Sequence, residues 1–552
     1  MTVQIRAIYE SSYLNIMSAI IKQLGLPQLM DRMVPVDPQC QTRPSDIVTL
    51  ILLDIFSGRQ ALVHLESWAH EIDLPKLIRE GVQPSQFNDD AIARHLDRLY
   101  QAGIHSILSA CLLQIYQKEG IPLRAFHGDT TDFSLYGAYE SASSATLNIT
   151  YGYNREGVRR KQIQFGLVGN EDGIPMYGDV HDGNQSDKTW NPSILAHVHE
   201  QLQRAKLDDE WIYVADSAAM TKDTLYQAKA ANAFLVTRGP HSLRIVKESL
   251  AKADSEEAVW SDPFSLAEKN GATYRVWETT ASYEGHPVRL IVVESSALDQ
   301  RKGNTLEKER AKEAEFLGQE QAHWHRHPFS CREDAEQALS SLKASLRPRF
   351  HRVEAGIEET MRPKKRRGRP KKGAEPETET VYTIRLGIEF DQEAWEQAKR
   401  KASRFVLVTT VPEEWKGQRM DGKEILALYK GQISVEMNFS FLKDPFFTDE
   451  IYVKKPERVA VLGYLFLLAL ALYRVFQRRV RQFITPERPL KGAGGRKLTR
   501  PTGQAIFQLF AYVKVVLLEL PDGQLQRSLG KPLTYEQRRI LQGLGMDEGI
   551  YV

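Results

Sequence analysis

Cysteine, net charge and long apolar runs are all scarce in this sequence, and each scarcity excludes a class of protein. The three cysteines, Cys40, Cys111 and Cys331, stand far apart, so they form neither a metal-ligand spacing nor a disulfide framework. A reducing compartment suits such a chain, and we expect a cytoplasmic protein. The 73 Lys and Arg residues nearly balance the 71 Asp and Glu residues, so support for a nucleic-acid partner must come from local clusters.

Membrane and secretion signals are also weak. The sequence does not open on a charged leader followed by an apolar run and a small-residue cleavage site, so secretion is not indicated. The longest apolar run, 459–473, is shorter than the ~20 residues that a helix needs to cross a bilayer. We predict a buried core helix there, with a membrane element as the alternative, and we expect no membrane partner.

The chain is longer than a single hydrophobic core supports, so we expect several domains in its 552 residues. Residues 1–120 carry helical apolar patterns and predict an all-helical N-terminal domain. Residues 121–240 alternate strands with helices, which predicts an α/β fold with a mixed sheet flanked by helices. Residues 241–400 break this order and predict an inserted domain. The sheet and helix patterns resume at 401–475, and 476–552 form a basic C-terminal region.

Individual elements follow from apolar periodicity and turn residues. Strands are predicted at 123–126, 161–168, 174–180, 211–215, 234–237 and 405–410, with one hairpin turn at 170–173 and a second hairpin at 274–283 and 288–293. Helices are predicted at 192–206, after Thr221, at 305–347, at 423–444 and near 506–520. Asn88 is a candidate cap for a helix that begins near residue 91.

Two aspartates stand at predicted strand ends, where α/β sheets bind ligands. Asp129 follows the strand at 123–126, and Asp216 follows the strand at 211–215. Together with one more acid they could hold a pair of Mg²⁺ ions, because Mg²⁺ takes few carboxylates and completes its shell with water and phosphate oxygens. The ordinary alternative for a single such aspartate is a cap or a turn.

The predicted helix at 423–444 supplies the third acid. Steps of ~100° per residue place four polar side chains on one face, namely Tyr429, Gln432, Glu436 and Lys443. A phosphodiester site uses such groups: the carboxylate to ligate metal, the ammonium to face phosphate, and the phenol and amide as hydrogen-bond partners. The alternative is a partly solvated face with an ordinary mix of polar residues.

The spacing of these four residues resembles the YREK signature of bacterial insertion-sequence DDE transposases of the family-four group. The triplet Asp129-Thr130-Thr131 resembles the DDT motif of that group, and Asp216 falls where its second aspartate is expected. The similarity spans roughly residues 85 to 520, and the family has arginine at the position of Gln432. The resemblance implies a ribonuclease-H-like catalytic core, interrupted by an inserted domain between the second aspartate and the glutamate.

The resemblance also implies a mechanism. Asp129, Asp216 and Glu436 would hold two Mg²⁺ or Mn²⁺ ions, and Tyr429, Gln432 and Lys443 would complete the catalytic site. The enzyme would cleave transposon ends at terminal inverted repeats and join them to target DNA by two-metal phosphoryl transfer. Its partners would be double-stranded DNA, as transposon ends and as target, and a second copy in a synaptic homodimer, with nucleoid association when bound to DNA.

Two basic segments are candidates for holding that DNA. Residues 362–372 are dense in Lys and Arg and resemble an AT-hook, with predicted minor-groove contacts from Arg366, Arg367, Gly368, Arg369, Lys371 and Lys372. A solvated linker is the alternative. The basic stretch 474–500 predicts contacts with the DNA backbone, chiefly from Arg478, Arg479 and Arg481.

Three questions stay open at the level of sequence. The N-terminal domain either binds DNA ends or mediates dimerisation. The chain is either an active transposase or a catalytically idle, transposase-derived DNA-binding protein, although all three acidic positions are intact. A nuclease on the same fold, which never joins strands, is the remaining alternative.

Overall fold

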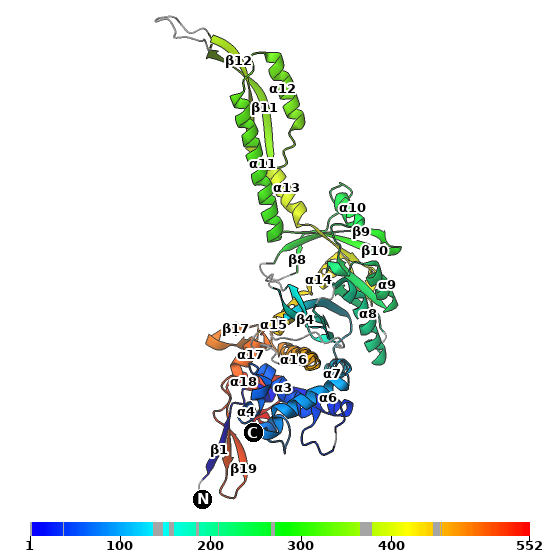
Figure 1. Ribbon diagram of the computed structural model, residues 1–552, viewed down its shortest axis with the longest axis vertical. Coiled ribbons are helices and arrows are strands. Elements are labelled where there is room, and N and C mark those ends of the chain that lie inside the picture. Colours follow the sequence, from blue (N-terminus) through cyan, green and yellow to red (C-terminus); the bar gives the residue numbers. More distant parts are fainter. Residues whose placement is uncertain are drawn as a thin grey trace, which may run out of the picture. The chain divides into compact units, whose positions relative to one another are not determined.

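The chain forms two compact units, seen as a ribbon in the computed structural model (Figure 1). The structure describes residues 3–36, 38–135, 147–153, 159–183, 187–207, 209–266, 271–364, 378–444, 453 and 455–552. The first unit comprises Met1–Pro240, Ala281–Arg289 and Val408–Val552. The second comprises His241–Thr280 and Leu290–Leu407, and it overlaps the interval 241–400 that the sequence marks as an insertion.

Helices make up most of the N-terminal and C-terminal parts of the first unit. They are α1 (Leu14–Gln23), α2 (Leu26–Met33), α3 (Pro44–Phe56), α4 (Leu65–Ala69), α5 (Leu74–Leu77), α6 (Asp89–Gln101), α7 (Ile104–Glu119), α8 (Asp187–Arg204), α9 (Lys222–Ala230), α14 (Gly422–Lys430), α15 (Ile433–Lys443), α16 (Pro456–Gln482), α17 (Gly503–Phe510) and α18 (Tyr535–Gly543). Short 3-10 turns lie at Leu62–His64, Pro84–Phe87, Ser217–Ala219, Ala493–Gly495 and Glu548–Ile550.

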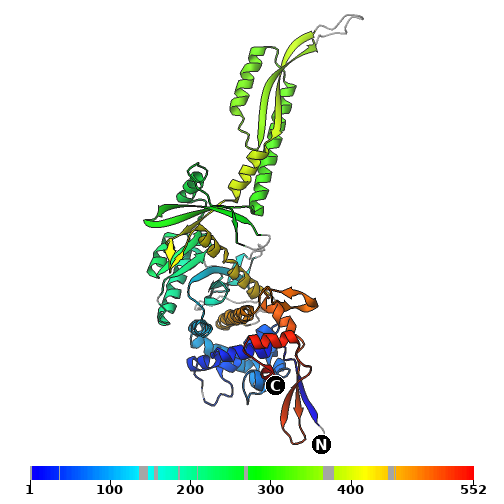
Figure 2. The same cartoon turned by 180° about the vertical axis from the view of Figure 1, so that it is seen from behind.

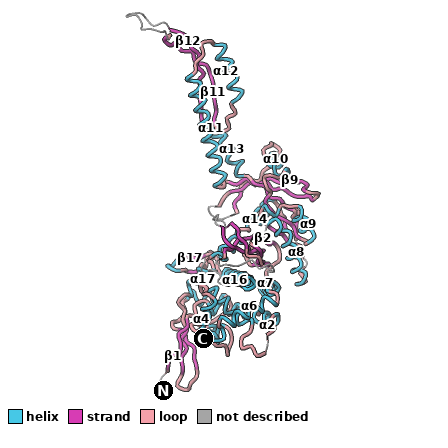
Figure 3. The backbone as a smooth tube through the Cα atoms, viewed as in Figure 1, coloured by secondary structure: helices cyan, strands magenta, loops and turns pink. Residues whose placement is uncertain are grey.

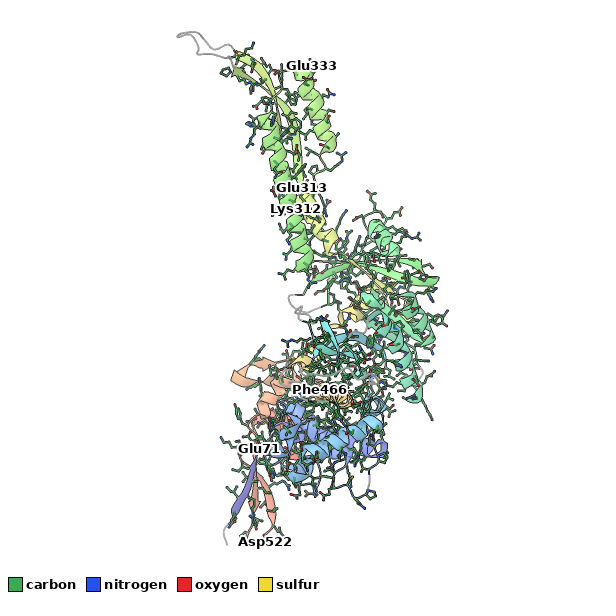
Figure 4. The ribbon with its side chains drawn as sticks, in the orientation of Figure 1. Glu71, Lys312, Glu313, Glu333, Phe466 and Asp522 are labelled. Carbon is green, nitrogen blue, oxygen red and sulfur yellow. The ribbon has the colours of Figure 1, made fainter. Side chains whose placement is uncertain are left out.

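The long helix α16 forms the core of this helical layer. From residue 459 to 473 it is apolar on all sides, as expected of a helix that is covered all round, and α3, α6 and α7 pack against it. Phe466, labelled in Figure 4, lies at its centre and is fully buried. Among the described helices, α16 has the length and composition to cross a membrane, but its apolar window is buried within the protein. The prediction of a buried core helix at 459–473 is therefore confirmed.

A small sheet joins the two ends of the chain. Strand β1 (Gln4–Tyr9) pairs antiparallel with β18 (Val515–Glu519), which pairs with β19 (Leu525–Leu529) (Figures 1 and 2). Two predictions are therefore wrong. The N-terminal region is not all-helical, and the helix predicted near 506–520 ends at Phe510, with a strand in its second half. A short apolar run does not reveal by periodicity alone whether it is helix or strand.

The first unit also contains the strands of the predicted mixed sheet. They are β2 (Ala125–Ser134), β3 (Thr150–Tyr153), β4 (Arg159–Gly169), β5 (Pro175–Asp182), β6 (Trp211–Ala215) and β7 (Ala233–Arg238). Strand β4 pairs antiparallel with β2, β3 and β5, whereas β2, β6 and β7 run parallel to one another. The hairpin turn at 170–173 is confirmed, and Gly173 has the positive φ of 77° that such a turn requires.

Short two-residue strands complete the first unit, at β14 (Glu414–Trp415), β15 (Gln418–Arg419), β16 (Leu490–Lys491) and β17 (Lys497–Leu498). The predicted helix at 192–206 is confirmed but begins earlier, at Asp187, with Pro192 inside it. The helix expected after Thr221 is confirmed as α9, which the Thr221 side chain caps. Asn88 caps α6, as predicted, by accepting a hydrogen bond from the Ala91 N–H at 2.9 Å.

The second unit combines helices with long strands. Its elements are α10 (Arg244–Lys252), β8 (Phe264–Ser265), β9 (Thr273–Tyr283), β10 (His286–Ser295), α11 (Gln300–Arg326), α12 (Arg332–Ser345), β11 (His351–Pro363), β12 (Thr378–Phe390), α13 (Gln392–Ser403) and β13 (Phe405–Thr409), several of which end in the first unit. Helices α11 and α12 flank the β11–β12 hairpin (Figure 3). Glu313 of α11, labelled in Figure 4, fixes the start of β11 by accepting the Phe350 N–H at 2.8 Å.

Candidate active site

Three parallel strands place two aspartates and one arginine at the same end of the sheet. His127 of β2 pairs with Val214 of β6, so continuing both strands by two residues places Asp129 level with Asp216. Ala215 pairs with Thr237 of β7, so the next step places Arg238 level with Asp216. Neighbouring strands lie ~4.8 Å apart. The three side chains therefore start from adjacent backbone positions.

The structure corrects one detail of the sequence-based expectation. Strand β2 does not end at residue 126 but continues to Ser134, so Asp129 lies within it rather than after it. The reason is the antiparallel partner β4, which pairs with β2 from His127 to Ser134 and keeps it extended. Asp129 is opposite Leu167 in that ladder and is half-buried.

Local hydrogen bonds orient both aspartates. The Asp129 Oδ1 accepts the Thr130 N–H at 2.8 Å. The Asp216 Oδ1 accepts the Ala218 N–H at 2.9 Å, so Asp216 also caps the short turn that follows β6. The Thr237 hydroxyl donates to the backbone carbonyl of Asp216 and ties β6 to β7 at this level. These hydrogen bonds therefore fix the orientation of both carboxylates at this end of the sheet.

The helix predicted at 423–444 is two helices. Helix α14 ends at Lys430 and α15 begins at Ile433, with Gly431 and Gln432 between them. The Gln432 N–H bonds to the Tyr429 carbonyl, three residues back, so the turn tightens at this point. A β-carbon at Gly431 would lie 3.0 Å from Cε1 of His127, so a larger residue would require a small shift of that ring. Both linking residues keep right-handed helical dihedrals, so Tyr429 and Glu436 stay close to one face of the two consecutive helices.

The phenol of Tyr429 lies within electrostatic range of the three predicted acids. Burial is the main cause that raises its pKa, and nearby charges act on it as well. The positive charge of Arg238 lowers this pKa, and three carboxylates raise it, in the order Asp216, Glu436 and Asp129. Acids that are far apart in the sequence therefore share one neighbour in the folded chain.

The third acid is the most open of the three. Glu436 is exposed, and its carboxylate has no hydrogen-bond or ion-pair partner among the described residues. Gln432 is half-buried at the start of α15, and Lys443 is exposed at the end of the same helix. Within the described part of the chain, no three His, Cys, Asp or Glu side chains are grouped closely enough to hold one metal ion. The three acids therefore share Tyr429 as a neighbour but do not form a complete metal-coordination site.

An interior hydrogen-bond chain holds α15 in place. Asn438 is fully buried, and its Nδ2 donates to the Gly173 carbonyl in the β4–β5 turn at 2.8 Å. Its Oδ1 accepts from Nε of Arg474 on α16 at 2.6 Å, and Arg474 also donates to Gln477 at 3.1 Å. Burial lowers the pKa of Arg474. The helix that carries Glu436 is thereby fixed to the sheet on one side and to α16 on the other.

Sequence reasoning missed Arg238, Asn438 and Arg474. Arg238 could have been found, because it follows the predicted strand 234–237 as Asp216 follows the strand 211–215. Asn438 and Arg474 carry no local signal. Their roles depend on which turn and which helix pack against α15, and the sequence does not specify that packing.

The predicted DNA-contacting arginines of α16 have internal partners. Arg479 pairs with Glu119 at 2.6 Å, and Arg478 pairs with Asp172 at 3.2 Å. Arg481 donates to the Pro501 carbonyl at 3.0 Å, and burial lowers its pKa to about 10. Their prediction as DNA contacts stays a prediction, and this geometry gives them a structural role. The AT-hook-like residues 366–369, 371 and 372 lie outside the described residues.

Comparison with known proteins gives limited matches. Residues 3–113 match a family model described as a domain of unknown function, DUF4277. No curated protein matches the sequence. Among solved structures, the cryo-EM structure of the piggyBac transposase synaptic complex with hairpin DNA is similar over 91% of this chain and 78% of that chain, at 9% identity and a TM-score of 0.36.

Two structures of the Mos1 transposase are also similar in part. The Mos1 paired-end complex with the left transposon end covers 36% of this chain and 60% of that chain, at 13% identity and a TM-score of 0.15. The Mos1 mariner paired-end complex with Mn covers 38% and 61%, at 13% identity and a TM-score of 0.16. These scores are too low to establish a common fold, so function must be inferred from the site itself.

Proposed function

We propose that this chain is a DDE-type DNA transposase of the family-four insertion-sequence group, which cleaves transposon ends and joins them to target DNA. One observation carries the proposal: Asp129, Asp216 and Glu436, the acids of the signature, all act on the phenol of Tyr429. The three acids come from two strands and a helix, and a chance match to a motif would not require them to lie near a common neighbour. The catalytic core that the resemblance implies is ribonuclease-H-like, and a mixed sheet with acids on adjacent strands supports it.

The three acids offer carboxylate oxygens, which are suitable ligands for a divalent metal ion. All are oxygen donors, and Mg²⁺ or Mn²⁺ takes few carboxylates and leaves room for water and phosphate oxygens. Because the three are not grouped closely enough for common coordination, one side chain must rotate to complete the site. Glu436 is exposed and unpaired among the described residues, so it can do so at low cost. Two bound ions would supply an activated nucleophile and a stabilised leaving oxygen.

The remaining side chains act on the DNA. Arg238, level with Asp216, and Lys443, at the end of α15, would supply positive charge for a phosphodiester bound at the acids. Because burial and three carboxylates raise its pKa, Tyr429 keeps its proton near neutral pH and can donate a hydrogen bond to a phosphate oxygen. Gln432 occupies the position of the signature arginine and offers an uncharged amide instead. Transposition brings two ends together, so at least two copies should act on one DNA complex.

Substitution of the acids tests the proposal. Asp129→Asn, Asp216→Asn and Glu436→Gln should each reduce Mg²⁺-dependent cleavage by at least ~10²-fold, the usual loss on removing one preorganised group. The substrate is a duplex that carries the DNA flanking the coding sequence, and binding to it should persist. Matched controls are Asp223→Asn on α9 and Glu424→Gln on α14, both exposed and outside the site.

The outcomes separate the alternatives. Full cleavage in the three acid variants would remove the proposed site. Cleavage of ends without recovery of joined products would identify a nuclease rather than a transposase. Binding without cleavage in the unmodified protein, at any Mg²⁺ or Mn²⁺ concentration, would identify a catalytically idle DNA-binding protein.

A further inference from the structure

A polar pocket of about 310 Å³ lies beside α6 in the helical part of the first unit. Arg94, His95 and Arg98 reach it from α6, Cys40 and Thr42 from the segment before α3, and Ser85 from the turn before α6. No acid and no Phe, Tyr or Trp ring is among the described residues that line it. The described lining therefore has positive charge and no carboxylate to neutralise it.

Neither arginine has a partner among the described side chains. They stand four residues apart on one helix face, so their side chains are neighbours. Neither guanidinium forms a hydrogen bond or ion pair with any described residue, although Asp90 lies one turn before Arg94. Elsewhere in this unit, Arg79 is paired with Asp46 at 2.8 Å and Arg458 with Asp97 at 2.7 Å. Asp46, whose charge acts on His95, is thus already paired with another arginine.

His95 adds a buried polar atom to this pocket. Its side chain is 2% exposed, its Nε2 lies 3.1 Å from the Thr42 hydroxyl, and its Nδ1 has no partner among the described residues. Burial, followed by the charge of Arg98, lowers the pKa of His95 to about 4, and Asp46 opposes the shift. The ring is neutral near pH 7, so the positive charge of the pocket comes from Arg94 and Arg98. An unsatisfied buried nitrogen indicates a missing hydrogen-bond partner.

We propose that this pocket binds backbone phosphate of double-stranded DNA, with Arg94 and Arg98 as its two cationic contacts. The inference rests on the proposed function and adds a DNA contact apart from the acidic residues. Unpaired guanidinium groups on one helix face suit phosphate oxygens, which they bind through paired N–H donors. A nucleobase is disfavoured because the described lining has no Phe, Tyr or Trp ring for it to stack on and the His95 ring is buried. A cation is disfavoured because the described lining has no carboxylate.

This assignment bears on the question that the sequence left open for residues 1–120. A phosphate contact orients DNA without reading its sequence. The pocket would therefore position duplex DNA for any sequence, and recognition of terminal repeats would need other residues. The helical N-terminal region then has a DNA-contact role, whether or not it also mediates dimerisation.

Salt dependence of DNA binding tests the pocket directly. The full chain and the variant Arg94→Ala/Arg98→Ala are titrated with a random-sequence duplex at several salt concentrations. The logarithm of the binding constant falls with the logarithm of the salt concentration, and the steepness of this slope should decrease by about 0.9 for each phosphate that the protein no longer neutralises. In the double variant it should therefore decrease by roughly 0.9 to 1.8. The control is Arg204→Ala on α8, whose exposed guanidinium is already paired with Glu200 at 2.6 Å and should leave the slope unchanged.

A wild-type slope in the double variant, with cleavage intact, would overturn this inference and leave the proposed function standing. Failure of the unmodified protein to bind any duplex would overturn both. Both arginines lie at least partly in solvent and support no other described side chain, so the variant should fold. A thermal unfolding midpoint equal to that of the wild type would confirm this.

Thiol protection gives a second readout that does not depend on the salt slope. Cys111 is fully buried and burial raises its pKa to about 12, so in a Cys331→Ser variant Cys40 is the thiol open to N-ethylmaleimide. A random-sequence duplex should slow the modification of Cys40 several-fold. The protection should disappear when Arg94→Ala/Arg98→Ala is added. Equal rates with and without DNA would contradict a DNA contact at this pocket.

Discussion

Arg474 donates a hydrogen bond from its Nε to the Oδ1 of Asn438 at 2.6 Å in the interior of the first unit. Asn438 follows Glu436 by two residues on α15, and its Nδ2 is bonded to the Gly173 carbonyl. The position of the third acid therefore depends on a side chain that never meets substrate. Asn438 and Arg474 are positioning residues for the proposed site.

Removing the Asn438 amide should weaken both the fold and the reaction. Asn438→Ala leaves the Gly173 carbonyl and the Arg474 guanidinium each with one partner fewer in the interior, which costs about 1 to 3 kcal/mol of unfolding free energy. Cleavage should fall roughly 10- to 100-fold, as is typical when a group that orients a ligand is removed. Urea denaturation and Mg²⁺-dependent cleavage measure the two effects. Ser440→Ala, at an exposed position on the same helix, is the control.

Arg238 should contribute to catalysis more than to DNA affinity. It stands level with Asp216 on the neighbouring strand and its charge acts on Tyr429. Arg238→Ala should lower cleavage by ~10²-fold, whereas duplex binding should change little because most phosphate contacts lie elsewhere. Arg238→Lys should recover part of the rate because it restores charge without the planar fork. Equal losses of binding and cleavage in the alanine variant would contradict this division.

Gly128 should tolerate no side chain. A β-carbon at this position would lie 2.3 Å from the hydroxyl of Tyr213, which is fully buried and hydrogen-bonded to Asn191 at 2.7 Å. Gly128→Ala should therefore cost about 1 to 3 kcal/mol of stability through overpacking, and it should shift the adjacent Asp129. Tyr213→Leu, which removes the clashing ring, should make the double variant more stable than the sum of the single effects. Additive losses would show that the two positions do not interact.

Asp54 should make the first unit less stable at higher pH. It is 1% exposed on α3, and burial raises its pKa to about 7. The hydrogen bond from the Gln60 N–H and the charge of Arg59 lower this pKa but do not outweigh burial. Since the folded pKa lies above the unfolded value, the bound proton stabilises the fold at low pH, and this stability is lost as pH rises through about 7. Asp54→Asn cannot ionise. The unfolding free energy of Asp54→Asn should therefore equal that of the wild type near pH ~4. The difference in favour of the variant should grow by about 1.4 kcal/mol per pH unit and level off above pH ~7.

Denaturation midpoints of wild type and Asp54→Asn across this range measure the effect. An advantage that is the same at every pH would show that the Asp54 carboxyl does not titrate with unfolding. An advantage that shrinks as pH rises would give the opposite sign and would also contradict the prediction.

The parts of the site that could be predicted are those set by local pattern. Strand β6 has the bounds 211–215 expected from its apolar run, and Asp216 follows from where that run ends. The face of Tyr429 and Glu436 follows from helical periodicity. The break at Gly431 was not predicted, although a glycine inside a helical pattern can mark a helix end.

Strand length, in contrast, could not be predicted from local pattern. The polar residues after Phe126 look like a loop in sequence, and only pairing with β4 extends β2 through Asp129. The apolar residues of β18 look like part of a helix until β1 provides hydrogen-bond partners for them. In each case a contact between distant segments outweighed the local preference.

The pairing of β1 with β18 ties folding of the first unit to the order of synthesis. Asn15 donates to the Ile550 carbonyl at 2.7 Å, and the Tyr551 hydroxyl donates to the Ser12 carbonyl at 2.8 Å. A nascent chain stopped before residue 515 would carry all three acids but leave β1 as an unpaired edge, exposed to association with other chains. Translation that ends early should therefore yield insoluble fragments rather than a folded first unit.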